Sequence, residues 1–290
     1  MFRQAVKLAC HTWFGACLTW GLIIDWAGCV VITTILPDGQ AQRRCCQWSH
    51  YVFRYFMLSS CPWIRVSRPP VEEVTRLLHR DRVCVLMNHT SFGDSIMFVA
   101  TTPSNIIWRY RTLMKSTLFD WPFLGGVCRM VGHFPVLFRS KDENSFAVDK
   151  PEQAKIMEKA AVPHSSALLE APTSAAPPIP QVKAHVESDG CLCLFPEGKI
   201  NRNPAVLCPF RRGTFGVAEE MNMAVVSLTT VGCDESWPRE SPVGGLPARI
   251  VIRLTEIAEA GHGLTAAALQ EKAEASMQAD VTSLLQERDA

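Results

Sequence analysis

A histidine and an aspartate five positions apart form the first group of residues that could do chemistry. Residues 88–94 read NHTSFGD, so His89 and Asp94 flank a short turn that contains a glycine. Imidazole is the side chain best suited to taking a proton from a hydroxyl at neutral pH. A carboxylate that reaches back to the other ring nitrogen fixes the tautomer and stabilises the imidazolium. The spacing alone is common, and a helix start capped by Ser91 or Asp94 is the simpler interpretation of this motif alone.

A second motif combines a forced turn with charged side chains. Residues 195–202 read FPEGKINR, and the proline and glycine project Glu197 from a turn. A carboxylate in this position suits the polar groups of a polyol, and Lys199 and Arg202 suit a phosphate. Taken alone, the segment is more simply an ordinary polar turn.

Strands that alternate with helices are expected to position both motifs. The sequence predicts strands at 83–87, 105–108, 133–138, 191–195, 224–230 and 249–254, and helices at 71–79, 93–100, 151–161, 213–221 and 264–286. This alternation predicts an α/β fold with a mostly parallel sheet flanked by helices. The two motifs then follow the carboxyl ends of strands, where open α/β sheets bind ligands. The proline- and alanine-rich segment 163–180 is predicted to be a surface insertion, with a functional lid as the alternative.

The N-terminal segment has the composition of a membrane anchor. Residues 8–36 are almost continuously apolar, and 18–36 alone have about the length that a bilayer requires. Tryptophans at 13, 20 and 26 suit a membrane interface. Asp25 is costly in lipid, which favours a tilted or re-entrant helix over one straight span. A cleaved signal peptide is the alternative, but its apolar region is normally shorter and no small-x-small cleavage site precedes Pro37.

A second hydrophobic stretch, 51–64, is too short to span and carries Arg54. It is predicted to be an amphipathic helix lying in the interface, with a core helix of the globular domain as the alternative. The flank after the apolar segment is the more basic one, with arginines at 43, 44, 54, 65 and 68 against Arg3 and Lys7 on the other side. This asymmetry predicts a cytosolic main domain. We therefore expect an anchor over 1–68 and a catalytic domain over 69–290, on the endoplasmic reticulum or another internal membrane.

Charge and cysteine content exclude other classes of protein. The formal net charge of +1 argues against general nucleic-acid binding. The twelve cysteines include no CxxC pair, and several lie in apolar runs, so they are expected to be reduced, buried thiols. Neither a disulfide scaffold nor a metal site is predicted.

Together the two motifs resemble those of the glycerolipid acyltransferase family, which includes 1-acylglycerol-3-phosphate acyltransferases. His89 and Asp94 match its H-x4-D catalytic motif. The substrate-binding F-P-E-G motif of the family is matched by Phe195, Pro196, Glu197 and Gly198. The resemblance covers roughly residues 71–230, and an N-terminal apolar anchor also fits the family.

Two further blocks extend the resemblance, and three departures qualify it. Residues 132–139 resemble the intervening block, whose final arginine, here Arg139, contacts the glycerol phosphate in the family; residues 209–215 match the stretch that follows F-P-E-G. The commonest form of the second motif is F-P-E-G-T-R, so the usual arginine is missing and Lys199 or Arg202 must replace it for phosphate binding. The block ending in Arg139 has one extra residue, and 224–230 lacks the usual proline of the final block. These departures concern the acceptor and leave the reaction class intact.

The resemblance implies direct transfer of a fatty acyl group from acyl-CoA or an acyl carrier to the free hydroxyl of a lysophospholipid in a bilayer. The first expected acceptor is 1-acyl-glycerol-3-phosphate, which gives phosphatidic acid; another lysophospholipid or glycerol 3-phosphate is the alternative. In this mechanism His89 deprotonates the hydroxyl, Asp94 orients the ring, and backbone amides near the start of the helix at 93 stabilise the oxyanion. No metal or tightly bound cofactor is required. Two alternatives remain, namely Ser91 as a nucleophile and a non-catalytic lipid-binding relative.

Overall fold

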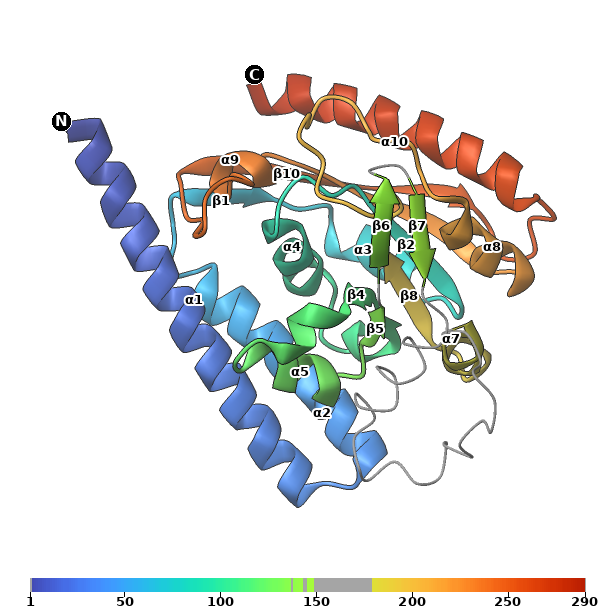
Figure 1. Ribbon diagram of the computed structural model, residues 1–290, viewed down its shortest axis with the longest axis horizontal. Helices are drawn as coiled ribbons and strands as arrows, with labels where there is room; N and C mark the ends of the chain where they lie inside the picture. Colours follow the sequence, from blue (N-terminus) through green and yellow to red (C-terminus); the bar gives the residue numbers. More distant parts are fainter. Residues whose placement is uncertain (1, 137, 143–144, 149–178, 290) are drawn as a thin grey trace.

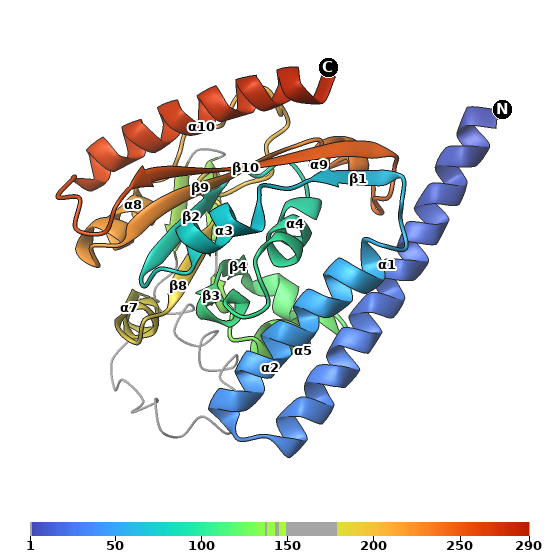
Figure 2. The same ribbon diagram turned by 180° about the vertical axis from the view of Figure 1, so that it is seen from behind.

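Six strands form the central sheet, in the order β1-β10-β9-β2-β8-β3. They are β1 (Ile64–Ser67), β2 (Val83–Met87), β3 (Tyr110–Arg111), β8 (Cys191–Leu194), β9 (Ala224–Val231) and β10 (Ala248–Ala258). Neighbouring strands are parallel, except that β9 and β10 are antiparallel. This computed structural model describes residues 2–136, 138–142, 145–148 and 179–289, and it confirms the predicted mostly parallel α/β sheet (Figures 1 and 2).

The alternating faces of β2 show why this strand lies inside the sheet. Val83, Val85 and Met87 pack into one hydrophobic core, while Cys84 and Leu86 pack into the other. All five side chains are buried. A strand that is apolar on both faces requires a layer of helices on each side.

Helices supply both layers (Figure 1). One core is covered by α7 (Ile179–Glu187), α8 (Arg212–Glu220) and α10 (Ala266–Asp289). The other is covered by α1 (Phe2–Ile35), α2 (Asp38–Tyr51), α3 (Val71–Leu78), α4 (Gly93–Thr101), α5 (Leu124–Met130) and the short α9 (Cys233–Ser236). The predicted helices at 71–79, 93–100, 213–221 and 264–286 are thereby confirmed within a few residues at each end.

Two expected strands are wrong in detail. The segment 105–108 is a turn that leads into a 3-10 helix, η2 (Ile107–Arg109), and the edge strand β3 follows it. The segment 133–138 contributes β5 (Phe134–Val136), which pairs with β4 (Leu113–Lys115) in a separate small sheet. A 3-10 helix, η3 (Ser116–Asp120), lies between these two strands in the chain. A hairpin of β6 (Phe138–Asp142) and β7 (Ser145–Val148) follows. The expected helix at 151–161 and nearly all of the insertion at 163–180 lie outside the described residues.

The helix α1 is long and apolar enough to cross a membrane, and it is the one such helix in the described part of the chain. It lies along one side of the domain (Figure 2). Near its start, His11 Nδ1 lies 2.8 Å from the carbonyl oxygen of Gly244, and near its end Trp26 packs edge-on against Phe123. The helix is therefore part of the folded domain over most of its length.

Because α1 packs against α2, Asp25 is not placed in lipid, where a carboxylate was expected to be costly. Asp25 is fully buried, and its Oδ1 accepts a hydrogen bond of 2.9 Å from Ser49 Oγ on α2. The carboxyl group therefore lies in the seam between α1 and α2, surrounded by protein.

The second hydrophobic stretch is helical over fewer residues than expected, and it has one buried side and one exposed side. A π-helix, η1 (Val52–Met57), continues α2 and ends before residue 64. Val52 and Met57 are buried in the domain, whereas Tyr55 and Phe56 are exposed. Because β1 also lies within the segment 1–68 and pairs with β10, the expected anchor contributes directly to the central sheet.

Candidate active site

His89 stands two residues after Met87, the last residue of β2, at the carboxyl end of the strand as expected. Its Nδ1 lies 3.1 Å from Asp94 Oδ2, so the turn brings the two motif residues into contact. The aspartate side chain is fully buried, while the histidine side chain retains 18% exposure. No hydrogen bond is made by the opposite ring nitrogen, Nε2, within the described residues, so this atom is available to an acceptor hydroxyl.

The turn between these residues is built around the Asp94 carboxylate. Its Oδ2 accepts hydrogen bonds from the backbone amides of Thr90 (2.7 Å) and Ser91 (2.8 Å) as well as facing the imidazole. Asp94 also lies in the first turn of α4, where the helix dipole favours a negative charge. The carboxylate is therefore fixed in place before any substrate arrives.

The same contacts bear on two further expectations about this turn, namely Ser91 as a nucleophile and backbone amides as oxyanion donors. The Ser91 hydroxyl donates to the Trp237 carbonyl (2.8 Å) and accepts from the Gly93 amide (3.1 Å), so the turn uses it as a structural group. The amides of Thr90, Ser91, Gly93 and Asp94 all have partners within the turn. These four amides are therefore occupied in this structure, and stabilisation of the oxyanion by amides near the start of the helix stays a prediction.

The F-P-E-G motif follows β8 and lies directly beside His89. Phe195 packs against the imidazole, with ring centroids 4.3 Å apart and planes inclined by 33°. The backbone amide of His89 donates to Glu197 Oε1 (2.8 Å), and its carbonyl oxygen accepts from the Asn201 amide (2.6 Å). The motif and the loop that follows it thus hold the histidine backbone from both sides, and Phe195 covers one face of the ring.

Glu197 has a position that the sequence did not predict. It is buried, and its second oxygen accepts a hydrogen bond from the Cys208 amide at 2.8 Å. Burial raises the pKa of this carboxyl group, and the hydrogen bonds from the His89 and Cys208 amides oppose the increase. In the described structure the carboxylate joins two loops; its expected contact with substrate stays a prediction.

The glycine of the motif is required by close packing. Gly198 has a φ of +64°, and an added Cβ would lie 2.0 Å from Arg211 Nε. Arg211 in turn donates to the Glu197 carbonyl oxygen at 3.1 Å. Gly198 and the buried Pro196 therefore shape the turn in this structure.

The expected phosphate-binding cations lie on two different elements of the chain. Lys199 and Arg202 are exposed on the loop after β8, and no ion pair with a carboxylate is formed by either within the described residues. Arg139 lies in β6, where it pairs with Ala147 of β7. The sheet neighbours of β2, the strand that precedes His89, are β8 and β9, so β6 is not paired with it.

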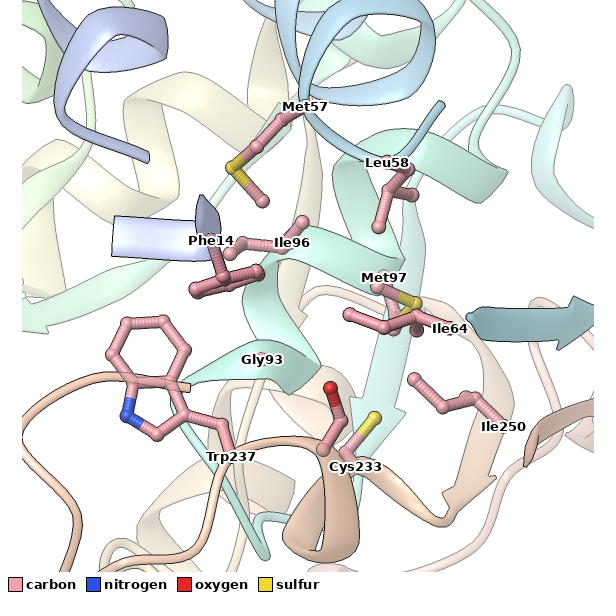
Figure 3. A pocket seen from close by; sticks show the side chains of 11 residues that line it. Phe14, Met57, Leu58, Ile64, Gly93, Ile96, Met97, Cys233, Trp237 and Ile250 are labelled. Atoms are coloured by element: carbon pink, nitrogen blue, oxygen red, sulfur yellow. The ribbon is translucent and has the colours of Figure 1, made fainter. Parts of the chain in front are cut away.

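A small apolar cavity lies below the first turn of α4. Its volume is about 10 Å³, and it is lined by side chains that include Phe14, Ile96, Met97, Cys233 and Trp237. Figure 3 shows these side chains gathered around Gly93. A space of this size holds about one water molecule, so it is a packing void between α1 and α4 that cannot contain an acyl chain.

The family of the protein can now be assigned. A family model described as Acyltransferase matches residues 68–231, which is more than half of the chain and includes both motifs. The chain belongs to the Acyltransferase family. It is therefore an acyltransferase, as the two motifs predicted.

Comparison with solved structures agrees with the fold. The structure is similar to the crystal structure of the 1-acyl-sn-glycerophosphate (LPA) acyltransferase PlsC from Thermotoga maritima, with a TM-score of 0.68. The match covers 97% of each chain at 14% sequence identity, so it establishes a shared fold that includes the N-terminal helices. No curated protein sequence matches the chain significantly.

Proposed function

We propose that the protein transfers a fatty acyl group from acyl-CoA or an acyl carrier to the free hydroxyl of 1-acyl-glycerol-3-phosphate, forming phosphatidic acid. The observation that carries the proposal is the contact of 3.1 Å between His89 Nδ1 and the buried Asp94 carboxylate, which leaves Nε2 facing away from the aspartate. A histidine held in this tautomer is a general base for a hydroxyl.

The chemical steps follow from this arrangement. Nε2 of His89 takes the hydroxyl proton as the oxygen attacks the thioester carbonyl, and Asp94 stabilises the imidazolium that forms. Collapse of the tetrahedral intermediate breaks the carbon–sulfur bond, and the departing thiolate receives the proton. The products are an ester and a free thiol, and no acyl-enzyme is formed.

The choice of acceptor rests on the motifs and on the matched structure. The structurally similar PlsC is described as an acyltransferase of 1-acyl-sn-glycerophosphate. Lys199 and Arg202 place positive charge on the loop next to the catalytic histidine, and a phosphate monoester would attract both. Arg139 is the third proposed phosphate ligand.

We further propose that the outer face of α1 and η1 contacts the bilayer. Large apolar side chains remain exposed there, among them Leu8, Trp13, Trp20, Tyr55 and Phe56. A straight span by α1 would carry the attached sheet and its loops into the hydrocarbon layer, where unpaired backbone is excluded. Contact in the plane of the interface avoids this cost. The side of the membrane is part of the same proposal: the cytosolic side of an internal membrane such as the endoplasmic reticulum, because more basic residues follow the apolar segment than precede it.

An acceptor panel tests the proposal. Purified full-length protein in mixed micelles is given one acyl-CoA and, in separate reactions, lysophosphatidate, lysophosphatidylcholine or glycerol 3-phosphate, and both free thiol and ester product are measured. Lysophosphatidate should give the highest kcat/KM. Preference for either other acceptor would contradict the proposed substrate, and thiol release without ester in every reaction would contradict the proposed transfer.

A further inference from the structure

The side of Asp94 that faces away from His89 is occupied by residues of β9. Thr230 Oγ1 lies 3.2 Å from Asp94 Oδ1, and both side chains are completely buried. A threonine hydroxyl has a single proton to donate. Two other acceptors lie near this hydroxyl, Asn88 Oδ1 at 3.5 Å and the sulfur of Cys233, and neither carries the charge of a carboxylate, so the proton belongs on the bond to Asp94.

Asn88 fixes the backbone of this threonine. The parallel pairing of β2 and β9 ends at Met87 and Leu228, one residue before Asn88. The Asn88 side chain then donates to the Thr230 carbonyl oxygen and accepts from the Thr230 amide, both at 2.8 Å. A carboxamide has one donor and one acceptor side, as a peptide unit does, so it extends the strand pairing past the end of β2.

Cys233 completes the surroundings of Asp94 on this side. The residue is fully buried at the start of α9 and lines the small cavity shown in Figure 3. Burial first, and then the negative charge of Asp94, raise the pKa of the Cys233 thiol well above its ordinary value. The thiol is therefore neutral, and it supplies no competing charge next to the carboxylate.

We infer that Thr230 is a positioning residue for the acyl transfer reaction, holding Asp94 in the orientation that directs its other oxygen to His89. The inference rests on the proposed role of His89 and Asp94. With one oxygen bonded to the β9 hydroxyl and the other to the turn amides, the carboxylate cannot rotate about its last bond without losing hydrogen bonds on both sides. The orientation of Asp94 toward the imidazole then depends on β9 as well as on the turn that follows β2.

The adjacent threonine provides a matched control. Thr229 is also fully buried in β9, but its hydroxyl has no hydrogen-bond partner among the described residues. Valine has nearly the shape of threonine and suits a strand. Thr229→Val and Thr230→Val therefore make the same chemical change in the same strand, and only the second removes a contact with Asp94.

The test measures kcat and KM for acyl transfer in Thr230→Val, Thr230→Ser, Thr229→Val and His89→Ala. Thr230→Val should lower kcat by roughly 10- to 100-fold, the range for losing a hydrogen bond to a charged group, with little change in either KM. Thr230→Ser keeps the hydroxyl and should restore most of the activity. Thr229→Val should match the wild type.

Several outcomes would overturn the inference. One is a kcat for Thr230→Val within about 2-fold of that for Thr229→Val. Another is a decrease in kcat in Thr230→Ser as large as that in Thr230→Val, which would assign the effect to packing of the methyl group. Loss of activity in His89→Ala with full activity in Thr230→Val would leave the proposed function intact and refute this inference alone. Full activity in His89→Ala would refute the proposed function itself.

Hydrogen exchange gives a readout that does not depend on the substrate. The amides of Thr90 and Ser91 are protected by their bonds to Asp94, so Thr230→Val should speed exchange in a peptide covering 88–94, and Thr229→Val should not. Unchanged exchange in Thr230→Val would show that the carboxylate is held without the threonine.

Discussion

Replacement of Glu197 by glutamine separates two roles that the sequence motif alone does not distinguish. Each carboxylate oxygen accepts one backbone amide, from His89 and from Cys208, at 2.8 Å. A glutamine side chain offers one oxygen and one NH2 group, so one of the two amides must face another donor. An unsatisfied buried donor costs about 1–3 kcal/mol. At roughly 2–4 °C per kcal/mol for a domain of this size class, the melting temperature should fall by about 2–12 °C.

Activity should fall together with stability in Glu197→Gln. The lost contact is made by the His89 backbone itself, and misplacement of a catalytic group by about 1 Å is enough for a 100-fold loss. We expect a decrease in kcat of roughly 10- to 100-fold with a small change in acceptor KM. Thermal unfolding and steady-state kinetics on the same preparation provide both measurements. Glu220→Gln, at an exposed residue paired with Lys183, is the control and should change neither quantity.

A direct substrate contact would give the opposite pattern. If Glu197 bound the acceptor, Glu197→Gln would raise acceptor KM while the melting temperature stayed within about 1 °C of the wild type, because the backbone contacts would then contribute little. That result would refute the positional role argued from the structure and favour the role implied by the motif.

Three further predictions use other parts of the structure. Burial, and then the charge of Arg111, lower the pKa values of His133 and His185 to about 4. Because unfolded histidine takes up its proton near pH 6.5, the stabilising contribution of these neutral histidines should be complete above that pH and decrease as the pH falls toward 4. The melting temperature should therefore depend less on pH in the double variant His133→Gln/His185→Gln than in the wild type. The same pH dependence in both proteins would contradict the lowered pKa values. Arg139→Ala should raise KM for lysophosphatidate more than for lysophosphatidylcholine, and equal increases would remove Arg139 from the phosphate site. Trp20→Ser combined with Phe56→Ser should reduce the fraction of protein that floats with liposomes, whereas full retention would show that the bilayer meets another surface.

The sequence predicts the centre of this fold well because the strongest patterns are local. Val83–Met87 is apolar at every position, and a turn motif follows it directly, so both the strand and the place of His89 are predicted correctly. The approach of Asp94 to His89 follows from a five-residue spacing across one turn. Contacts of this kind depend on a few neighbouring residues and need no knowledge of the rest of the chain.

Other features depend on partners far away in the sequence. One oxygen of Asp25 accepts a hydrogen bond from Ser49, and one oxygen of Glu197 accepts from the His89 amide; no local pattern reveals either pairing. The helix α2 was missed because its buried face consists of small residues such as Ala41, Cys45 and Ser49, which give a weak hydrophobic signal. The position of Thr230 beside Asp94 depends on the pairing order of the strands.

The structure also changes what removal of the N-terminal segment should do. From the sequence, residues 1–68 form an anchor that is separable from the domain. In the structure, Phe14, Cys29 and Met57 belong to the hydrophobic core, and β1 is an edge strand of the central sheet. A deletion would expose that core, so point substitutions on the outer face are the better test of membrane contact.

The most direct test of the account is the turnover of His89→Ala with acyl-CoA and lysophosphatidate, followed by release of the free thiol. The variant should keep the wild-type melting temperature within a few degrees, because the side chain is partly exposed and most contacts of the turn are made by backbone and by Asp94. Removal of a general base should lower kcat by about 10²- to 10⁴-fold. Turnover close to wild type in a folded sample of this variant would contradict the proposed mechanism.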